Sequence, residues 1–406
     1  MAESPSHVRG GARARIEDTL AWVDTHAQGL AAENVPLTEA AGRILARHEL
    51  ASLDLPPFDR AAVDGVAVRA EETVGASTYN PCVLQYIVAP GELTPGGARR
   101  INAGEALPGG ADAVVRLDYI GSDGVGRATL TEPIVAGSGV ERSGSQAARG
   151  STLATAGRRL RPADLALFAC AGLERVAVVR RPRVRCLLAE GTAQAGTAHS
   201  QSGDSALLRA LIERDGGILV EQRTLSRSVA ALRHALAPPG VDLIVVAGGT
   251  GSGSNDHAAR ALAEAGEIAI AGVALRHAET TCMGMAAGVP VFLLPGAPAA
   301  CLLAYEFFAG RALRRRGGQA PGLPFPSRSM TAARKIVSEI GLAELRPVRC
   351  RDDRSVEPIP FLAEAGLRAL TEADGFVLIS EESEGYPQSA NLTVYLYNGY
   401  GRAQPQ

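Results

Sequence analysis

The sequence predicts a multidomain protein built around a doubly wound α/β domain, with a β-rich domain before it and a small β domain after it. Three observations support this fold class. The chain has 406 residues, which is too long for one ordinary domain. Short apolar runs alternate with helical patterns from about residue 183, as in parallel βαβ units. The flanking regions carry short runs rich in valine and glycine, bounded by turn residues, which are typical of β structure.

Helical spacing marks the first segment, because Ile16, Leu20 and Val23 fall on one helical face. A second short helix is predicted over 37–45 and another over 161–171, which has Pro162 in its first turn. We expect a helical, elongated N-terminal domain over 1–50 and 146–175, a β-rich insertion domain over 51–145, an α/β domain over 176–316, and a C-terminal β domain, barrel-like, over 327–406.

The elements expected in the α/β domain are strands over 184–190, 243–247 and 289–294, and helices over 204–214, 256–264 and 298–309. The uncharged stretch 280–305 is long enough to cross a bilayer, but its prolines and glycines favour strand, turn and helix. The N-terminal residues lack the apolar core of a signal peptide. We expect a cytoplasmic protein that does not bind membranes.

Charge and cysteine usage exclude several classes. The chain carries 41 basic and 43 acidic residues, whereas a general nucleic-acid binder needs a basic excess. Lys335 is the only lysine, so the other cations are arginines. The six cysteines lack metal-ligand or redox spacing, as expected for reduced thiols inside a cell.

A glycine-rich loop over 247–257 follows the predicted strand 243–247 and precedes a helix. Ligands of doubly wound sheets bind beyond the carboxyl ends of the strands, and a helix N-terminus there attracts phosphate. Asp256 could hold a divalent metal or merely cap the helix, and the pattern leaves both open.

A second loop, 293–300, follows the strand 289–294 in the same way, with Pro295 and Pro298 fixing its backbone. Two such loops in one domain favour a phosphate-bearing or anionic ligand. The candidate binding residues of the two loops are Gly248, Gly249, Thr250, Gly251, Gly253, Pro295, Gly296 and Pro298. No catalytic triad, paired carboxylate or zinc pattern competes with this interpretation.

Five segments in order resemble the molybdopterin molybdenumtransferase family, which includes MoeA and the E domain of gephyrin. They are DLPPFDRAAVDGVAVR (54–69), RINAGEALPGGADAVV (100–115), VAGGTGSGSND (246–256), LLPGAPAA (293–300) and TEADGFVLISEESEGY (371–386). One such match would be weak, but five in order across about residues 15–398 are specific.

The resemblance implies a MoaB/Mog-like α/β domain within an elongated homodimer. It implies ligation of molybdate to adenylylated molybdopterin, with Mg²⁺-dependent release of AMP. Asp256 and Asp204 would hold Mg²⁺ or the phosphoryl groups, and Asp64 would reach in from the partner subunit as a third catalytic residue. The implied partners are a molybdopterin nucleotide and other molybdenum-cofactor proteins or a client molybdoenzyme.

The departures from the family pattern concern the oxyanion. The family's basic KPGKP segment aligns with 276–280, where Arg276 keeps one charge and Glu279 reverses the other. Ala297 and Ala300 replace an asparagine and a serine, and Glu364 falls on a second serine. A dianion needs cations and hydrogen-bond donors, so the sequence predicts weak molybdate binding.

These departures leave several functions open. The chain could be an active transferase with an altered oxyanion site, or a non-catalytic paralogue that binds molybdopterin or its nucleotide as a carrier or regulator. A third hypothesis is a related enzyme that adenylylates molybdopterin or cleaves the pyrophosphate of another nucleotide. A fourth is a scaffold protein. The phosphate-facing residues favour an enzyme, whereas the altered oxyanion residues favour the carrier.

Overall fold

The fold was analysed in a computed structural model that describes residues 13–89, 91–122, 126–190, 203–236, 239–251, 253, 256–351, 354–361 and 366–397. The chain forms two compact units, Glu33–Val178 and a second unit made of Met1–Ala32 with Val179–Gln406. This division groups the first helix with the α/β region, and the four-domain boundaries stay a prediction.

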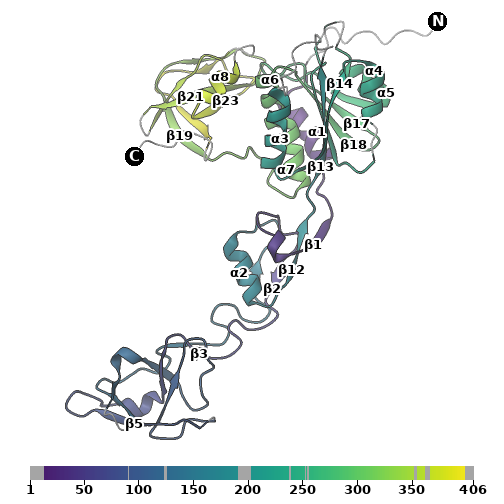
Figure 1. The fold of residues 1–406 in the computed structure, drawn as a ribbon. Coiled ribbons are helices and arrows are strands. Elements are labelled where there is room, and N and C mark those ends of the chain that lie inside the picture. Colours follow the sequence, from purple (N-terminus) through teal and green to yellow (C-terminus); the bar gives the residue numbers. More distant parts are fainter. Residues whose placement is uncertain are drawn as a thin grey trace, which may run out of the picture. The chain divides into compact units, whose positions relative to one another are not determined.

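The unit Glu33–Val178 is mostly β structure (Figure 1). Its elements are β1 (Ala32–Pro36), η1 (Leu37–Glu39), β2 (Glu49–Leu50), β3 (Arg60–Ala61), β4 (Gly65–Val68), η2 (Ala70–Thr73), β5 (Cys82–Tyr86), β6 (Gly97–Ile101), β7 (Ala113–Arg116), η3 (Leu117–Tyr119), β8 (Gly121–Ser122), β9 (Arg127–Leu130), β10 (Val140–Glu141), β11 (Thr152–Ala154), α2 (Pro162–Cys170) and β12 (Arg175–Val179). Six of these strands form one sheet in the order β7-β4-β6-β5-β9-β8.

The helix predicted over 37–45 is wrong. Only the 3-10 turn η1 forms there, and Ile44 and Leu45 make bridges to Arg159 and Val178 instead. The apolar residues of this stretch pack into a small core around Phe168 of α2. Contacts with distant strands therefore override the local helical spacing.

The second unit contains a six-stranded sheet in the order β14-β13-β15-β18-β17-β16. The elements of this α/β part of the unit are α1 (Ile16–His26), β13 (Arg183–Glu190), α3 (Gly203–Arg214), β14 (Ile218–Ser226), α4 (Val229–Ala235), β15 (Leu243–Ala247), α5 (Ala258–Ala265), β16 (Gly266–Ala271), β17 (Cys282–Ala286), β18 (Val289–Leu294), α6 (Pro298–Ala304), η4 (Tyr305–Ala309) and α7 (Gly310–Arg316). Neighbours among β14, β13, β15 and β18 run parallel, and β17 and β16 add an antiparallel edge.

Helices cover both faces of this sheet, which confirms the doubly wound α/β class (Figure 1). On one face, alternate strand residues such as Val245 and Phe292 pack against α1, α3, α6 and α7. On the other face, Val246 and Leu293 pack against α4 and α5. Successive side chains of a strand point to opposite faces of the sheet, so neighbouring apolar residues pack into opposite helix layers.

Buried charges join α3 to the long helical run 298–316. Arg314 donates to Asp215 at 2.8 Å, and Arg214 pairs with both Asp215 and Glu306. Burial raises the pKa of Glu306, and the hydrogen bond from Arg214 opposes that shift. The network fixes α3 against η4, whose π-helical geometry adds one residue to the turn.

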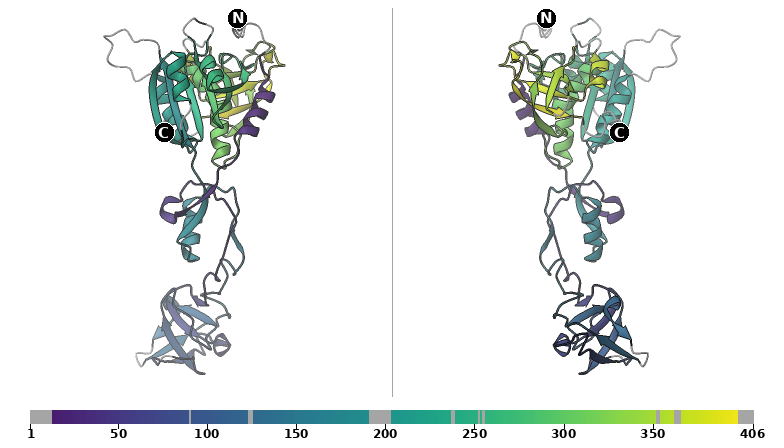
Figure 2. Two further views of the ribbon diagram at one scale, coloured as in Figure 1. Left: turned by 90° about the vertical axis from the view of Figure 1, so that its right-hand side faces the viewer. Right: turned by 90° about the vertical axis from the view of Figure 1, so that its left-hand side faces the viewer.

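The C-terminal segment forms a closed barrel, which confirms the predicted barrel-like β domain (Figure 2). The five strands follow the order β19-β22-β21-β23-β25. Its elements are β19 (Ser327–Ala332), β20 (Ile336–Val337), β21 (Glu344–Arg351), β22 (Ser355–Pro358), α8 (Gly366–Glu372), β23 (Gly375–Ile379), β24 (Gly385–Tyr386) and β25 (Asn391–Leu396). Phe361 and Phe376 share a buried cluster with the α/β helices. Barrel and α/β layers therefore pack as one body.

No helix in the described parts of the chain is long and apolar enough to span a membrane. The uncharged stretch 280–305 forms β17, β18 and α6, so the prediction of strand, turn and helix is confirmed there.

Candidate functional site

The candidate site lies at the carboxyl ends of β13 and β15. From β13 the chain crosses through α3 to β14 on one side, and from β14 it returns through α4 to β15 on the other side. The strand order thus reverses between β13 and β15. Open α/β sheets bind ligands at such a switch point, and the glycine-rich loop begins there.

Gly248 and Gly249 turn the backbone sharply away from β15. Their φ angles are +93° and +70°, in the left-handed region that favours glycine. A Cβ at Gly248 would lie 2.6 Å from the carbonyl oxygen of Ala189, at the end of β13. The Gly248 N–H donates to Leu294 at 2.9 Å. Close backbone packing therefore requires glycine at 248, and the positive φ favours glycine at 249.

The second loop lies directly against the first. A Cβ at Gly296 would come within 3.0 Å of the Cα of Gly248. Pro298 opens α6, and a Cβ at Gly203, the first residue of α3, would lie 3.4 Å from the Pro298 ring. Pro295, which follows β18 directly, completes this turn. The starts of α3 and α6 therefore meet beside the glycine-rich loop, and the two predicted loops form one surface.

Asp256 does not cap the following helix. The cap position of α5 is His257, and α5 begins at Ala258. The Asp256 Oδ2 atom accepts the Gly253 N–H at 3.0 Å, and a Cβ at Gly251 would lie 2.6 Å from that oxygen. The carboxylate thus folds back against its own loop, and the glycines at 251 and 253 leave room for it.

The other oxygen of Asp256 faces a cation that the sequence analysis did not identify. Arg227 Nη1 lies 3.7 Å from Asp256 Oδ1. Arg227 directly follows β14, a strand that the sequence analysis missed. Had β14 been recognised, the position of Arg227 after its carboxyl end would have marked it as a site residue.

Asp204, in the first turn of α3, is buried with 7% of its surface exposed. Burial, together with the charge of Asp204, raises the pKa of the Cys186 thiol to about 12 and raises that of Cys301. Asp204 therefore lies below the loops, near β13 and α6. No group of three acidic, histidine or cysteine side chains that could hold a metal occurs among the residues that the structure describes.

The glycine-rich loop also touches the segment that carries Arg276. The hydroxyl oxygens of Thr250 and Thr280 lie 3.0 Å apart. Four residues before Thr280, Arg276 donates its backbone N–H to Ala343 of the barrel at 2.8 Å. The site therefore extends from the strand ends towards the barrel.

Arg276 lines a pocket of about 610 Å³ between the α/β layers and the barrel. Its lining residues are Arg276, Lys335, Ile336, Val337, Ser338, Glu339, Arg346, Pro358, Ile359 and Pro360. Three cations, including the only lysine of the chain, thus face this pocket. Arg276 pairs with Glu339 at 3.2 Å. Arg346 pairs with the buried Glu344 at 2.5 Å and donates to the Val337 carbonyl at 3.0 Å.

Glu279, the residue expected to repel the oxyanion, does not belong to the described lining of this pocket. Its backbone carbonyl accepts the Val273 N–H at 3.1 Å. Ala300 is buried in α6, and Glu364 lies outside the described residues. Lys335 thus adds to this pocket a cation that the alignment did not show.

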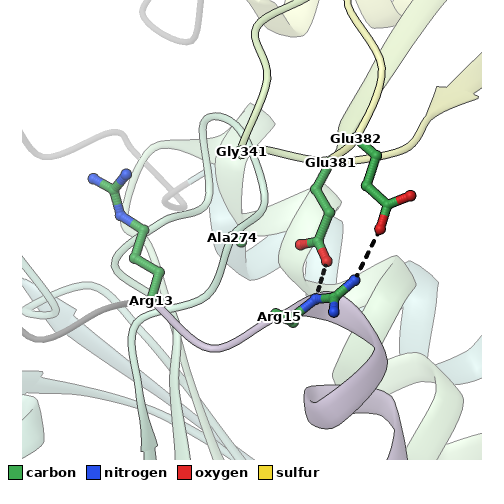
Figure 3. Close-up of a pocket in the computed structure, with 6 residues that line it drawn as sticks. All are labelled: Arg13, Arg15, Ala274, Gly341, Glu381 and Glu382. Atoms are coloured by element: carbon green, nitrogen blue, oxygen red, sulfur yellow. Dashed lines mark hydrogen bonds and ion pairs between the residues drawn. The ribbon is translucent and has the colours of Figure 1, made fainter.

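A second pocket, of about 410 Å³, is lined by Arg13, Arg15, Ala274, Gly341, Glu381 and Glu382 (Figure 3). Arg15 Nε and Nη2 pair there with Glu381 at 2.6 Å and Glu382 at 3.2 Å. Two carboxylates neutralise this guanidinium, so the pair ties α1 to the barrel rather than forming an anion site.

Asp64 lies in the other compact unit, beside β4, where its Oδ1 atom accepts the Ala103 N–H at 2.8 Å. It is exposed, and Glu105 lies close enough for the two charges to repel. Its predicted contribution from a partner subunit stays a prediction.

The chain matches two family descriptions, "MoeA N-terminal region (domain I and II)" over residues 14–172 and "Probable molybdopterin binding domain" over residues 193–315. It is 32% identical over 387 residues to "Molybdopterin molybdenumtransferase 2" of Mycobacterium tuberculosis, which covers 89% of this chain and 94% of that protein. A molybdopterin molybdenumtransferase of Bacillus subtilis is 31% identical over 68% of each chain.

The solved structure of a molybdopterin biosynthesis MoeA protein from Pyrococcus horikoshii has a similar fold. Its TM-score is 0.78 at 28% sequence identity, covering 95% of this chain and all of that chain. Two family descriptions, full-length relatives and a shared fold lead to the same conclusion. The chain belongs to the molybdopterin molybdenumtransferase family.

Proposed function

We propose that this protein ligates molybdate to adenylylated molybdopterin and releases AMP. One observation carries the proposal. The Thr250–Thr280 contact joins the loops at the strand ends to the segment that leads to the three-cation pocket. A phosphate-bearing ligand at the loops and an oxyanion at the cations would then lie on one surface.

The residues that would bind the phosphates are those of the two loops. Gly248 and Gly249 let a ligand approach the backbone closely, and the α5 N-terminus adds partial positive charge. In the pocket, Lys335 would offset one charge of molybdate, and Arg276 and Arg346, which already pair with Glu339 and Glu344, would donate hydrogen bonds to its oxygens. The names of the relatives favour this enzyme over a non-catalytic carrier.

Mg²⁺ remains a prediction for this chain, and the side chains around Asp256 fit it poorly. One carboxylate oxygen accepts the Gly253 N–H, and the other faces the Arg227 guanidinium. A divalent cation at that oxygen would be repelled by Arg227. Asp204 is buried below the loops. We therefore assign no step of the reaction to Mg²⁺.

We also propose a homodimer, in which Asp64 of one subunit would complete the site of its partner. Support comes from the family, and a molybdopterin nucleotide and other molybdenum-cofactor proteins are the proposed partners. A place in the cytoplasm is likewise a proposal, for which membership of the family is the support.

The test is release of AMP from adenylylated molybdopterin, measured with and without added molybdate. We expect release that depends on molybdate and is lost in Arg276→Ala. The matched control is Arg328→Ala, which removes an exposed barrel arginine outside the described lining of the pocket. Tight nucleotide binding without any molybdate-dependent release would contradict the transferase and favour the carrier.

A further inference from the structure

Arg227 occupies a fixed position at the edge of the proposed phosphate site. β14 ends at Ser226 and α4 begins at Val229. The side chain of Ser228 caps α4 by accepting the Ala231 N–H at 3.2 Å. Arg227 is thus held between a strand end and a capped helix, next to the end of β13.

The Arg227 guanidinium is anchored to the same carbonyl that packs against the glycine-rich loop. Its Nε donates to the Ala189 carbonyl oxygen at 3.0 Å. That oxygen is also the atom that a Cβ at Gly248 would meet at 2.6 Å. The guanidinium therefore lies beside the first glycine of the loop, where a bound phosphate is expected.

The contact between Arg227 and Asp256 leaves the guanidinium suited to a second anion. At 3.7 Å it is a charge contact rather than a hydrogen bond. A phosphate oxygen could therefore take Nη N–H groups without breaking a hydrogen bond to Asp256. The planar fork of arginine matches phosphate geometry, and its side chain here is 36% exposed.

We infer that Arg227 is a phosphate-binding residue that supplies the cation expected from Mg²⁺ at Asp256. The inference rests on the proposed function, because it assigns the phosphate to the loops at the strand ends. The Asp256 carboxylate alone would repel a phosphate, and the guanidinium facing it offsets that charge. Nucleotide binding should therefore need Arg227 and not a divalent metal.

The test measures AMP binding by calorimetry, once with Mg²⁺ and once with a chelator. The native protein should bind AMP with the same affinity in both buffers. Arg227→Gln should weaken binding about tenfold to a hundredfold, the effect of losing one charge-assisted hydrogen bond. Arg227→Lys should lose less AMP affinity, because lysine keeps the positive charge but lacks the planar, two-pronged guanidinium.

Arg233→Gln is the matched control. Arg233 pairs with Glu264 at 3.6 Å between the last turns of α4 and α5. Its ion pair resembles that of Arg227 with Asp256, but it lies at the C-terminal ends of α4 and α5, away from the loops of the site. We expect its AMP affinity to equal that of the native protein, whatever the buffer.

A double-mutant cycle with Asp256→Asn separates binding from a purely structural role. If Arg227 touches the phosphate, Arg227→Gln should weaken AMP binding in the Asp256→Asn protein as well. An effect that disappears in that background would mean that Arg227 acts only by holding Asp256, and the inference would be wrong.

The other outcomes are equally distinct. Native AMP binding that is lost with the chelator, or an Arg227→Gln protein that binds as the native one does, would overturn the inference and leave the proposed function intact. No AMP binding in either buffer would overturn the proposed phosphate site, and this inference with it.

Discussion

The hydroxyl oxygens of Thr250 and Thr280 lie 3.0 Å apart, although 29 residues separate them along the chain. Thr250 belongs to the glycine-rich loop after β15, and Thr280 precedes β17. This contact links the proposed phosphate site to residues 276–280. Arg276, at the start of this segment, donates its backbone N–H to Ala343, next to the barrel strand β21.

Gly296→Ala should disturb the phosphate loops. The added Cβ would lie 3.0 Å from the Cα of Gly248, so backbone must shift at one of the two loops. We expect a loss of about 1–3 kcal/mol in unfolding free energy, typical of overpacking, together with weaker AMP binding. Gly322→Ala is the control, because its Cβ would meet no atom within 4 Å. Equal AMP affinity in both variants would argue against the close packing of the loops.

Lys335→Met should weaken molybdate binding about tenfold to a hundredfold, because one charge-assisted hydrogen bond to the dianion would be lost. Titration calorimetry with molybdate measures the change. The control is Arg334→Met, which alters the neighbouring exposed cation that does not belong to the described pocket lining. If the native protein binds molybdate only weakly, as the alignment at Glu279 predicts, the three-cation pocket is not the oxyanion site.

Arg314→Met should destabilise the α/β core by about 3–5 kcal/mol, the usual cost of breaking a buried ion pair. Arg314 and Asp215 are both almost fully buried, and their pair joins α7 to the residue that follows α3. Denaturant unfolding measures the change. Arg368→Met, which breaks the exposed pair with Glu372, should change stability by less than about 1 kcal/mol. Similar effects of both changes would mean that the buried network contributes little.

His277→Asn should flatten part of the pH dependence of stability. Burial lowers the pKa of His277 below its usual value of 6.5, and its Nε2 is buried without a hydrogen-bond partner among the described residues. The unfolded chain therefore takes up this proton first, so stability falls as the pH drops through 6.5 towards the folded pKa. Asparagine tolerates the φ of +68° found here.

The measurement for His277 is the melting temperature of both proteins between pH 5 and pH 8, with 6.5 as the reference value. On acidification, the melting temperature of the native protein should fall more than that of the variant. Parallel curves would show that His277 does not titrate differently in the folded state.

The proposed homodimer predicts complementation between two inactive variants. Light scattering should give twice the mass of one chain. Asp64→Asn and Arg276→Ala should each lose AMP release, and a mixture of the two should recover part of it. Recovery requires that mixed dimers contain one intact shared site. A monomeric mass, or no recovery after confirmed subunit exchange, would contradict the shared site.

Sequence alone determined the class of fold, because the relevant signals are local. Alternating strands and helices between residues 183 and 309, and glycines directly after strand ends, identified both loops of the site. Pro162, predicted in the first turn of a helix, is the first residue of α2. Motif order identified the family, since five segments spread over the chain are matched independently of any packing.

Tertiary structure decided what depends on contacts between distant residues. Residues 37–45 pack with remote strands instead of forming a helix, and β14 is recognisable from its pairing with β13. Arg227 reaches Asp256, and Lys335 joins Arg276, only after the sheet and the barrel have formed. Charge complementarity depends on distance in space, so an alignment could show the cation lost at 279 but not that Lys335, from another segment, lies in one pocket with Arg276.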